Sequence, residues 1–267
     1  MNVAEQAASA GIYPIDYGDR LRIGAIIPSG NTSVEPELLA MAPPGVGFFF
    51  TRAALTGSTE QELLGMAAGA GAAARLLADA RVDRIVFHCT GVTTFSPEIG
   101  QRIRTEIESL TGIPTIVTSD AIIAALNALR ARRIVLLTPY VELVHEREKA
   151  YLKRNDIDVV LDRALGLNTN TEMGALEPAF LARYVRDNAA GAADACFLSC
   201  TALRSAGVIA ALEAELGRPV ITSNQAAVWY ALASAGLQGE PAAFGRLFAC
   251  PLPDAPAPPS AVDAMTA

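Results

Sequence analysis

The chain repeats part of its own sequence, and this internal repeat limits its fold more than any other feature. Segment 22–28 (RIGAIIP) returns as 133–139 (RIVLLTP), and 87–90 (FHCT) returns as 198–201 (LSCT). Both pairs share an offset of 111 residues. A third pair of segments is separated by 104 to 105 residues, as a short deletion in the second copy would produce. Self-similarity at a fixed offset indicates a repeated structural unit, so we expect two similar halves.

Each half contains four short apolar runs rich in β-branched residues, separated by longer stretches with helical spacing. Near-continuous apolar runs, such as 134–138, are typical of strands buried on both faces of a sheet. We therefore expect an α/β fold of two pseudo-symmetric flavodoxin-like lobes with parallel four-stranded sheets and an active site between them. The expected strands are 22–27, 46–51, 83–88, 114–118, 133–138, 157–161, 194–199 and 219–222.

The repeat also sets the expected organisation along the chain. We expect an N-terminal arm over 1–20, a first lobe over 21–130 and a second lobe over 131–240, with helices near the C-terminus packing across the first lobe. Residues 251–267 are rich in Pro and Ala and lack an apolar period. Such a segment cannot form a core, so we expect a disordered tail.

Composition excludes several classes of partner. The net charge is −7 and no long basic cluster occurs, which argues against nucleic acid. No apolar stretch approaches the roughly 20 residues of a membrane-spanning helix, so no membrane partner is expected. The N-terminal residues lack the features of a secretory signal. We expect a cytoplasmic protein whose four cysteines are thiols, and a homodimer or homotetramer.

Cofactor and metal motifs are also missing. The chain has two histidines and no CxxC or HExxH spacing, so no metal is expected. The GxGxx string at 69–74 falls within an expected helix and not in a strand-to-helix turn. The two lysines, Lys149 and Lys153, lie on one charged helix and suit no buried Schiff base. We expect an enzyme that needs no cofactor.

Small polar residues follow the expected strands. In open parallel sheets ligands bind beyond the carboxyl ends of the strands. Hydroxyls, amides and helix N-termini at such positions suit a small carboxylate, because N–H donors and the helix dipole bind anions. The candidate binding residues at these ends are Ser29, Asn31, Thr90, Tyr140 and Thr201.

Cys89 and Cys200 occupy equivalent strand ends in the two halves. A lone free cysteine is usually a small buried apolar residue, and Cys196 and Cys250 fit that description. The matched pair favours a catalytic role instead, with each thiol at a helix start that lowers its pKa and both facing one substrate. His88 is expected to be a satisfied buried residue. His145 lies in a run of charges, 142–148, that is typical of a solvated helix face.

From about residue 20 to 237 the chain resembles the aspartate/glutamate racemase superfamily, and within it the maleate cis-trans isomerase and arylmalonate decarboxylase group. The resemblance rests on both cysteines and on three motifs: RIGxIxPSxNTxxE at 22–35, RRIxLxTPY at 132–140 and NTEMGxxEP at 170–178. It implies Cys89 as nucleophile and Cys200 as proton donor, with Asn31, Tyr140 and Asn170 holding the carboxylates of maleate or a close analogue.

Other reactions stay open at this point. Both cysteines are followed by threonine, as is frequent in the amino-acid racemases of the superfamily, so racemisation or epimerisation of an α-substituted acid is the first alternative. Arylmalonate decarboxylases typically retain only the second-half cysteine, and Cys89 therefore argues against simple decarboxylation. A protein that only binds small acids is a further alternative, because a fold alone does not establish catalysis.

Overall fold

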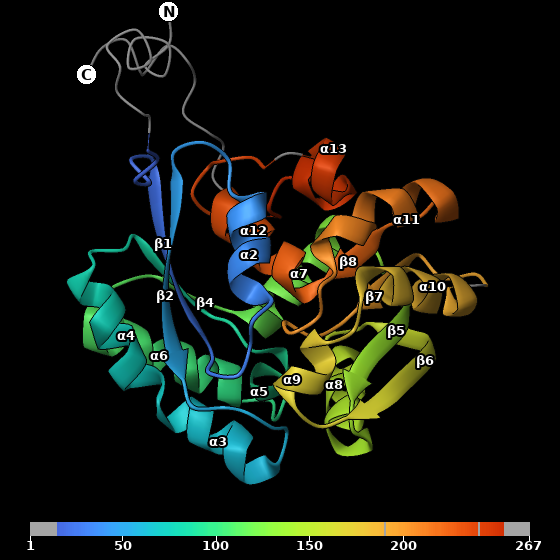
Figure 1. The fold of residues 1–267 in the computed structure, drawn as a ribbon, viewed down its shortest axis with the longest axis horizontal. Helices are drawn as coiled ribbons and strands as arrows, with labels where there is room; N and C mark the ends of the chain where they lie inside the picture. Colours follow the sequence, from blue (N-terminus) through green and yellow to red (C-terminus); the bar gives the residue numbers. More distant parts are fainter. Residues whose placement is uncertain (1–14, 190, 240, 254–267) are drawn as a thin grey trace, which may run out of the picture.

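The computed structural model describes residues 15–189, 191–239 and 241–253. Two parallel four-stranded sheets organise them (Figure 1). The first consists of β1 (Leu21–Pro28), β2 (Val46–Ala53), β3 (Arg84–Phe87) and β4 (Thr115–Val117). The second consists of β5 (Arg133–Tyr140), β6 (Asp158–Leu167), β7 (Ala195–Leu198) and β8 (Val220–Thr222).

The two sheets have the same strand order. It is β2-β1-β3-β4 in the first and β6-β5-β7-β8 in the second, and every pairing is parallel. This is the order of a flavodoxin-like sheet, and it follows the repeat seen in the sequence. The expected α/β fold class is confirmed.

All eight expected strands are present, but β6 is longer than predicted. The apolar run suggested 157–161, whereas β6 continues to Leu167. β6 is an edge strand, so only one neighbour pairs with it and many of its residues are half-buried or exposed. Charged residues such as Asp162 and Arg163 are tolerated there, and a criterion based on apolar runs therefore ends the strand too early.

Helices cover both faces of the sheets (Figure 1). Alternate residues of β1 enter two cores: Ile23, Ala25 and Ile27 pack on one face and Ile26 on the other, as the two-residue period of a strand requires. The helices of the first half are α2 (Val34–Met41), α3 (Glu60–Ala68), α4 (Ala70–Asp79), α5 (Thr90–Thr93), α6 (Ile99–Thr111) and α7 (Thr118–Ala128). Those of the second half are α8 (Glu142–Arg154), α9 (Asn170–Gly174), α10 (Pro178–Asn188), η1 (Ala206–Val208), α11 (Ile209–Leu216), α12 (Ser223–Ala233), α13 (Pro241–Phe244) and η2 (Arg246–Ala249).

The two halves pack through equivalent helices. α7 and α12, which each follow the fourth strand of their half, contact one another, and α12 also contacts α2 (Figure 1). Arg84 adds a polar contact, because its guanidinium donates to the hydroxyl and the carbonyl of Ser234 at 3.1 and 2.7 Å. The cores of both sheets are continuous across this junction.

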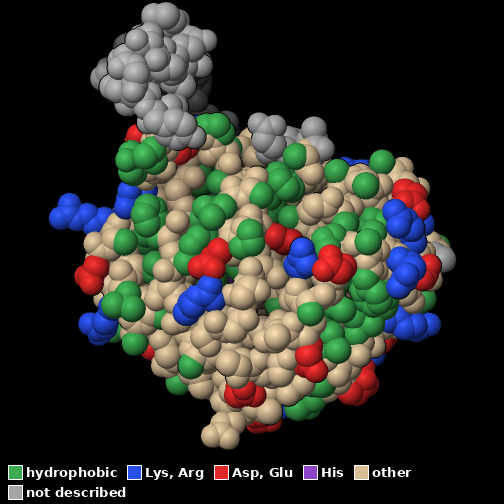
Figure 2. Space-filling model, in the orientation of Figure 1, with side chains coloured by type: hydrophobic (Ala, Val, Ile, Leu, Met, Phe, Trp, Pro, Cys, Tyr) green, Lys and Arg blue, Asp and Glu red, His purple; other side chains and the backbone are tan. Residues whose placement is uncertain are grey.

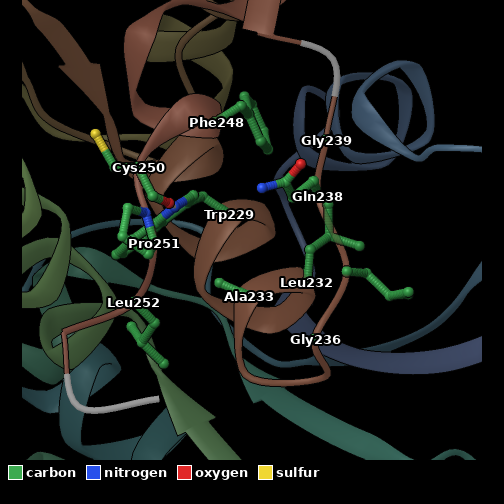
Figure 3. Close-up of a pocket in the computed structure, with 11 residues that line it drawn as sticks. Trp229, Leu232, Ala233, Gly236, Gln238, Gly239, Phe248, Cys250, Pro251 and Leu252 are labelled. Atoms are coloured by element: carbon green, nitrogen blue, oxygen red, sulfur yellow. The ribbon is translucent and has the colours of Figure 1, made fainter. Parts of the chain in front are cut away.

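The last described residues return to α12. The indole of Trp229 donates to the carbonyl of Cys250 at 2.9 Å, and a small pocket of ≈ 110 Å³ lies beside it (Figure 3). The arm expected over 1–20 is described from residue 15, and most of the tail expected over 251–267 lies outside the described residues. Within the described ranges, none of the helices has the length and apolar character needed to cross a membrane.

Candidate active site

Cys89 and Cys200 follow the third strand of each sheet and are both buried. Cys89 comes after β3 and caps the short helix α5, and Cys200 comes after β7. Cys89 is 6 % exposed and Cys200 is 4 % exposed. The two thiols are close enough for the charge of one to raise the pKa of the other. The fold therefore brings the predicted pair together.

The thiols are not acidic, contrary to what helix N-termini led us to expect. Burial raises the pKa of Cys89 to about 12 and that of Cys200 to about 11. Backbone N–H groups of Gly91 and Val92 oppose the shift at Cys89, but α5 is only four residues long. Cys200 is followed by a turn, and the next helical segment begins at Ala206. Loss of hydration outweighs the helix dipole at both thiols.

Cys200 has an unusual backbone conformation. Its φ angle is 116°, a value that residues with a side chain seldom adopt and that the surrounding contacts must maintain. Two hydrogen bonds hold it: its N–H donates to Ser223 Oγ at 3.1 Å, and the Ala202 N–H donates to Cys200 Sγ at 3.3 Å. The sulfur also lies 3.7 Å from the Met173 sulfur. The thiol is thus held at a fixed position.

Tyr140 completes the group around the thiols. It ends β5, is almost fully buried, and its hydroxyl hydrogen-bonds the Cys200 sulfur, which lowers the pKa of that thiol. Burial and the nearby charges of Cys200 and Glu148 raise the pKa of Tyr140 well above its usual range. The phenol is therefore a neutral donor at physiological pH. It can hydrogen-bond a thiolate or a substrate carboxylate.

Asn31, Thr90 and Thr201 connect the two halves beside the cysteines, and all three are buried. The Asn31 amide donates to Thr201 Oγ1 at 3.2 Å, and its carbonyl oxygen accepts from the N–H groups that begin α2. Thr90 Oγ1 donates to Ser223 Oγ at 2.9 Å. Ser223 therefore contacts both Thr90 and the Cys200 backbone, a connection that the sequence argument did not identify.

Asn170 and Ser29 lie around the same backbone segment after β2. Asn170 Nδ2 donates to the Leu55 carbonyl at 3.0 Å, and the Ser29 hydroxyl accepts from the Leu55 N–H at 3.0 Å. Asn170 also approaches Gly30, where an added Cβ would lie 3.3 Å from the Asn170 Cβ. Asn170 is half-buried, whereas Ser29 is exposed and its hydroxyl is turned toward the Leu55 backbone.

The histidines differ from one another. His88 is the satisfied buried residue that we expected: its ring nitrogens lie 3.1 Å from Thr118 Oγ1 and 2.8 Å from Asn224 Oδ1. The interpretation of His145 as solvated is wrong, because the residue is 2 % exposed. Its ring contacts Thr138 Oγ1 and Asp162 Oδ1, both at 2.9 Å.

A ring nitrogen of His145 and carboxylate oxygens of Glu146 and Asp162, atoms of the kind that can bind a metal ion, lie within 4.8 Å of one another. The ammonium of Lys149 already lies among these acids, 2.7 Å from Glu146 and 3.3 Å from Asp162. These residues therefore fit an ion-pair network in which Lys149 supplies the positive charge.

Glu148 lies beside the second thiol although its sequence position did not predict a role in the site. Its position in the charged run 142–148 suggested solvent exposure, yet it is 1 % exposed and accepts from the Ser199 hydroxyl at 2.6 Å. Burial raises its pKa to about 7, and its charge raises the pKa of both Cys200 and Tyr140. A titrating carboxyl group therefore lies beside the second thiol.

Comparison with known proteins agrees with this architecture. The chain matches the family model of arylmalonate decarboxylase over residues 23–248. It is 30 % identical to the maleate isomerase of Nocardia farcinica over 237 residues, which cover 85 % of this chain and 94 % of the relative. It is 36 % identical to the arylmalonate decarboxylase of Bordetella bronchiseptica over 142 residues, which cover 52 % and 59 %.

Two solved structures share the fold over nearly their whole length. One is a cysteine-to-alanine variant of the maleate isomerase Iso from Pseudomonas putida S16 with maleate, at a TM-score of 0.80 and 26 % identity, covering 86 % of this chain and 98 % of that one. The other is a cysteine-to-serine variant of the Nocardia farcinica maleate cis-trans isomerase with a covalently bound succinylcysteine intermediate, at a TM-score of 0.79 and 27 % identity, covering 85 % and 98 %. This chain belongs to the arylmalonate decarboxylase family and is an enzyme of the isomerase type that its curated relatives represent.

Proposed function

We propose that this chain catalyses the cis-trans isomerisation of maleate or a closely similar cis-enedioate, without a cofactor, through Cys89 and Cys200. The observation that supports the proposal is the placement of the two thiols. Equivalent ends of β3 and β7 bring them into one buried site together with the Tyr140 hydroxyl. Isomerisation through a single-bonded intermediate needs a nucleophile and a proton donor on one substrate, and two thiols can supply both.

In this mechanism Cys89 reacts as the thiolate while Cys200 is protonated, and the Cys89 sulfur adds to one alkene carbon of the bound dicarboxylate. The electron pair of the double bond moves toward the other carbon and its carboxylate, and Cys200 gives that carbon a proton. The former double bond is now a single bond and rotates. Cys200 then takes a proton back from the same carbon, the carbon–sulfur bond breaks, and the double bond forms again as the trans isomer.

The carboxylates require hydrogen-bond donors that tolerate burial. Asn31 keeps one amide hydrogen beyond the one that it gives to Thr201, and Tyr140 and Asn170 each carry a donor. We assign the carboxylates to Asn31, Tyr140 and Asn170, with Thr90 and Thr201 as neighbouring hydroxyls. Fixed donors of this kind also stabilise the negative charge that develops on the substrate during addition. Ser29 can join them as a donor only by giving up the 3.4 Å hydrogen bond that its hydroxyl donates to the Leu55 carbonyl.

Proton NMR of maleate incubated with the purified protein and a reductant tests the proposal. The expected result is conversion to fumarate, reduced at least about 100-fold in Cys89→Ser and in Cys200→Ser because each variant lacks a reacting thiol. Cys250→Ser is the matched control, since this half-buried cysteine lies near the end of the described chain and its rate should be unchanged. Folded wild-type protein that leaves maleate intact, or full activity in both active-site variants, would refute the proposal.

Decarboxylation of an arylmalonate is the second candidate. It is favoured by the family model and by the 36 % identity to an arylmalonate decarboxylase. The presence of Cys89 favours isomerisation instead. The same NMR experiment with phenylmalonate in D₂O separates the two, because decarboxylation gives a deuterated arylacetate. Racemisation, the first alternative from the sequence, would appear there as deuterium at the α-carbon of an amino acid or related acid.

A further inference from the structure

The proposed reaction needs one thiolate, and burial opposes its formation. With pKa values of about 12 and 11, Cys89 and Cys200 are both protonated at neutral pH. A thiol in this state is a weak nucleophile unless a neighbouring base removes its proton. The site therefore requires a proton acceptor that titrates near neutrality.

Neither histidine is free to act as this acceptor. His88 bonds Thr118 and Asn224 with its two ring nitrogens, and burial lowers its pKa to about 4. His145 bonds Thr138 and Asp162 in the same manner. Both ring nitrogens of each histidine are therefore already engaged.

Glu148 has the geometry that the histidines lack. One carboxylate oxygen, Oε1, is held by the Ser199 hydroxyl at 2.6 Å, and Ser199 directly precedes Cys200. The other oxygen, Oε2, is buried and has no hydrogen-bond partner among the described residues. A buried carboxylate oxygen without a partner is costly, and a proton taken from a neighbouring group would satisfy it.

The charged groups around Glu148 do not neutralise it. On its own helix, Lys149 pairs with Glu146 and with Asp162 of β6, and Arg147 pairs with Glu60 of α3. The groups that face Glu148 from β5 and from the end of β7 are Tyr140 and Cys200. The carboxylate therefore acts mainly on the thiol and the phenol of the active site.

We infer that Glu148 is the proton acceptor that activates the cysteine pair, acting through Cys200. This inference rests on the proposed function. The Cys200 S–H bond breaks, an O–H bond forms on Glu148 Oε2, and the electron pair stays on sulfur. The Ala202 N–H hydrogen-bonds the resulting thiolate, and the Tyr140 hydroxyl, which has one hydrogen to donate, does so until a substrate carboxylate accepts it instead.

The remaining protons then balance. The Cys200 thiolate takes the Cys89 proton as the Cys89 sulfur adds to the alkene, and Cys200 delivers that proton to the neighbouring carbon. Elimination runs the same transfers in reverse and returns the proton to Cys89. Glu148 keeps its proton throughout, and no oxidant or reductant is consumed.

The first test is the pH dependence of maleate isomerisation in Glu148→Gln. In wild type, kcat/KM should rise with pH as Glu148 loses its proton near pH 7. Glu148→Gln should lower kcat at least about 100-fold, remove this rise and leave KM nearly unchanged. Glu148→Asp should recover part of kcat. Glu146→Gln, an exposed carboxyl on the same helix, is the matched control and should behave as wild type. Wild-type kcat and an intact pH rise in Glu148→Gln would overturn the inference.

A second measurement does not depend on maleate. In a Cys89→Ser background, the rate of iodoacetamide modification of Cys200 is followed against pH. If Glu148 accepts the Cys200 proton, the modification rate in the protein that keeps Glu148 should rise as Glu148 loses its own proton and show an inflection near pH 7. Glu148→Gln lacks the acceptor and should show no such inflection. The same pH profile with and without Glu148 would overturn the inference even if maleate is isomerised. Failure of wild type to isomerise maleate would refute the proposed function, while the alkylation result would still report whether Glu148 and Cys200 are coupled.

Discussion

At the residue scale, burial sets the protonation states around the site. His88 is fully buried, and the loss of hydration lowers its pKa to about 4 although Asn224 hydrogen-bonds its ring. Loss of hydration acts in the opposite direction on the acids, where it raises the pKa of Glu148 and of both thiols. Each shift favours the neutral form, as expected for groups withdrawn from water.

His88 makes stability sensitive to acid. Its pKa is about 4 in the folded protein and 6.5 in the unfolded chain, so the unfolded state binds more protons between these values. The free energy of unfolding should fall by up to about 3 kcal/mol as the pH drops through this window. His88→Gln removes this term, and its stability should decline less between pH 6.5 and 4.5. Urea unfolding of both proteins at the two pH values measures the difference. Equal losses in the two proteins would contradict the assignment.

The sequence predicted the cysteine pair but not Glu148, and the reason lies in α8. The repeat marked Cys89 and Cys200 because both copies retain a cysteine after the third strand. The charged residues of α8 suggested a helix face exposed to solvent. The buried residues of α8 nevertheless recur with the period of a helix: Val144, His145, Glu148, Tyr151 and Leu152. That spacing places Glu148 on the inner face. The spacing of the apolar residues around Glu148 therefore indicated that this carboxyl group is buried.

At the element scale, α9 holds Asn170 against the first half. Thr169 caps the helix by accepting from the Glu172 N–H, and the Glu172 carboxylate accepts from the Thr169 N–H in return. The backbone of Asn170 donates to the Thr56 carbonyl at 3.0 Å, and Gly57 pairs with Thr169. The position of Asn170 thus depends on a cap in the second half and a loop in the first.

Thr169→Ala should therefore affect both stability and substrate binding. Loss of the cap should lower the free energy of unfolding by about 1 kcal/mol. Because Asn170 is the first residue of α9, KM for maleate should rise while kcat changes little, as expected when binding is weakened equally in ground and transition states. Thr59→Ala is the control, since Thr59 and Glu62 form the same capping box on α3. It should lose similar stability with an unchanged KM. Equal KM values in the two variants would show that the α9 cap does not position Asn170.

Elements were predictable where one physical signal dominated. Buried strands such as β1 and β5 read as apolar runs, and their positions follow from the sequence. The turn after Cys200 was not predictable, because the residue adopts a positive φ that no local sequence signal demands and that its contacts with Ser223 and Ala202 maintain. The C-terminal part of β6 was not predicted for a similar reason, because the extent of an edge strand is set by pairing with its neighbour and not by its own apolar residues.

At the scale of the whole molecule, the duplication explains why one site needs both halves. The thiols come from β3 and β7, and contacts such as those of Asn31 with Thr201 and of Thr90 with Ser223 cross between the halves. Charged side chains of both signs are interspersed on the face in Figure 2. Assembly into a homodimer or homotetramer stays a prediction.

The most direct test of a shared site is the capture of substrate on one thiol when the other is disabled. Cys200→Ser is incubated with maleate, and the intact mass and the cysteine-containing peptides are measured. A mass increase equal to one maleic acid is expected on Cys89, because its sulfur can still add slowly with a proton taken from solvent, while elimination, which needs a base to remove that proton from carbon, is slower still. Absence of the adduct in protein that binds maleate, or its location on any cysteine other than Cys89, would contradict the account.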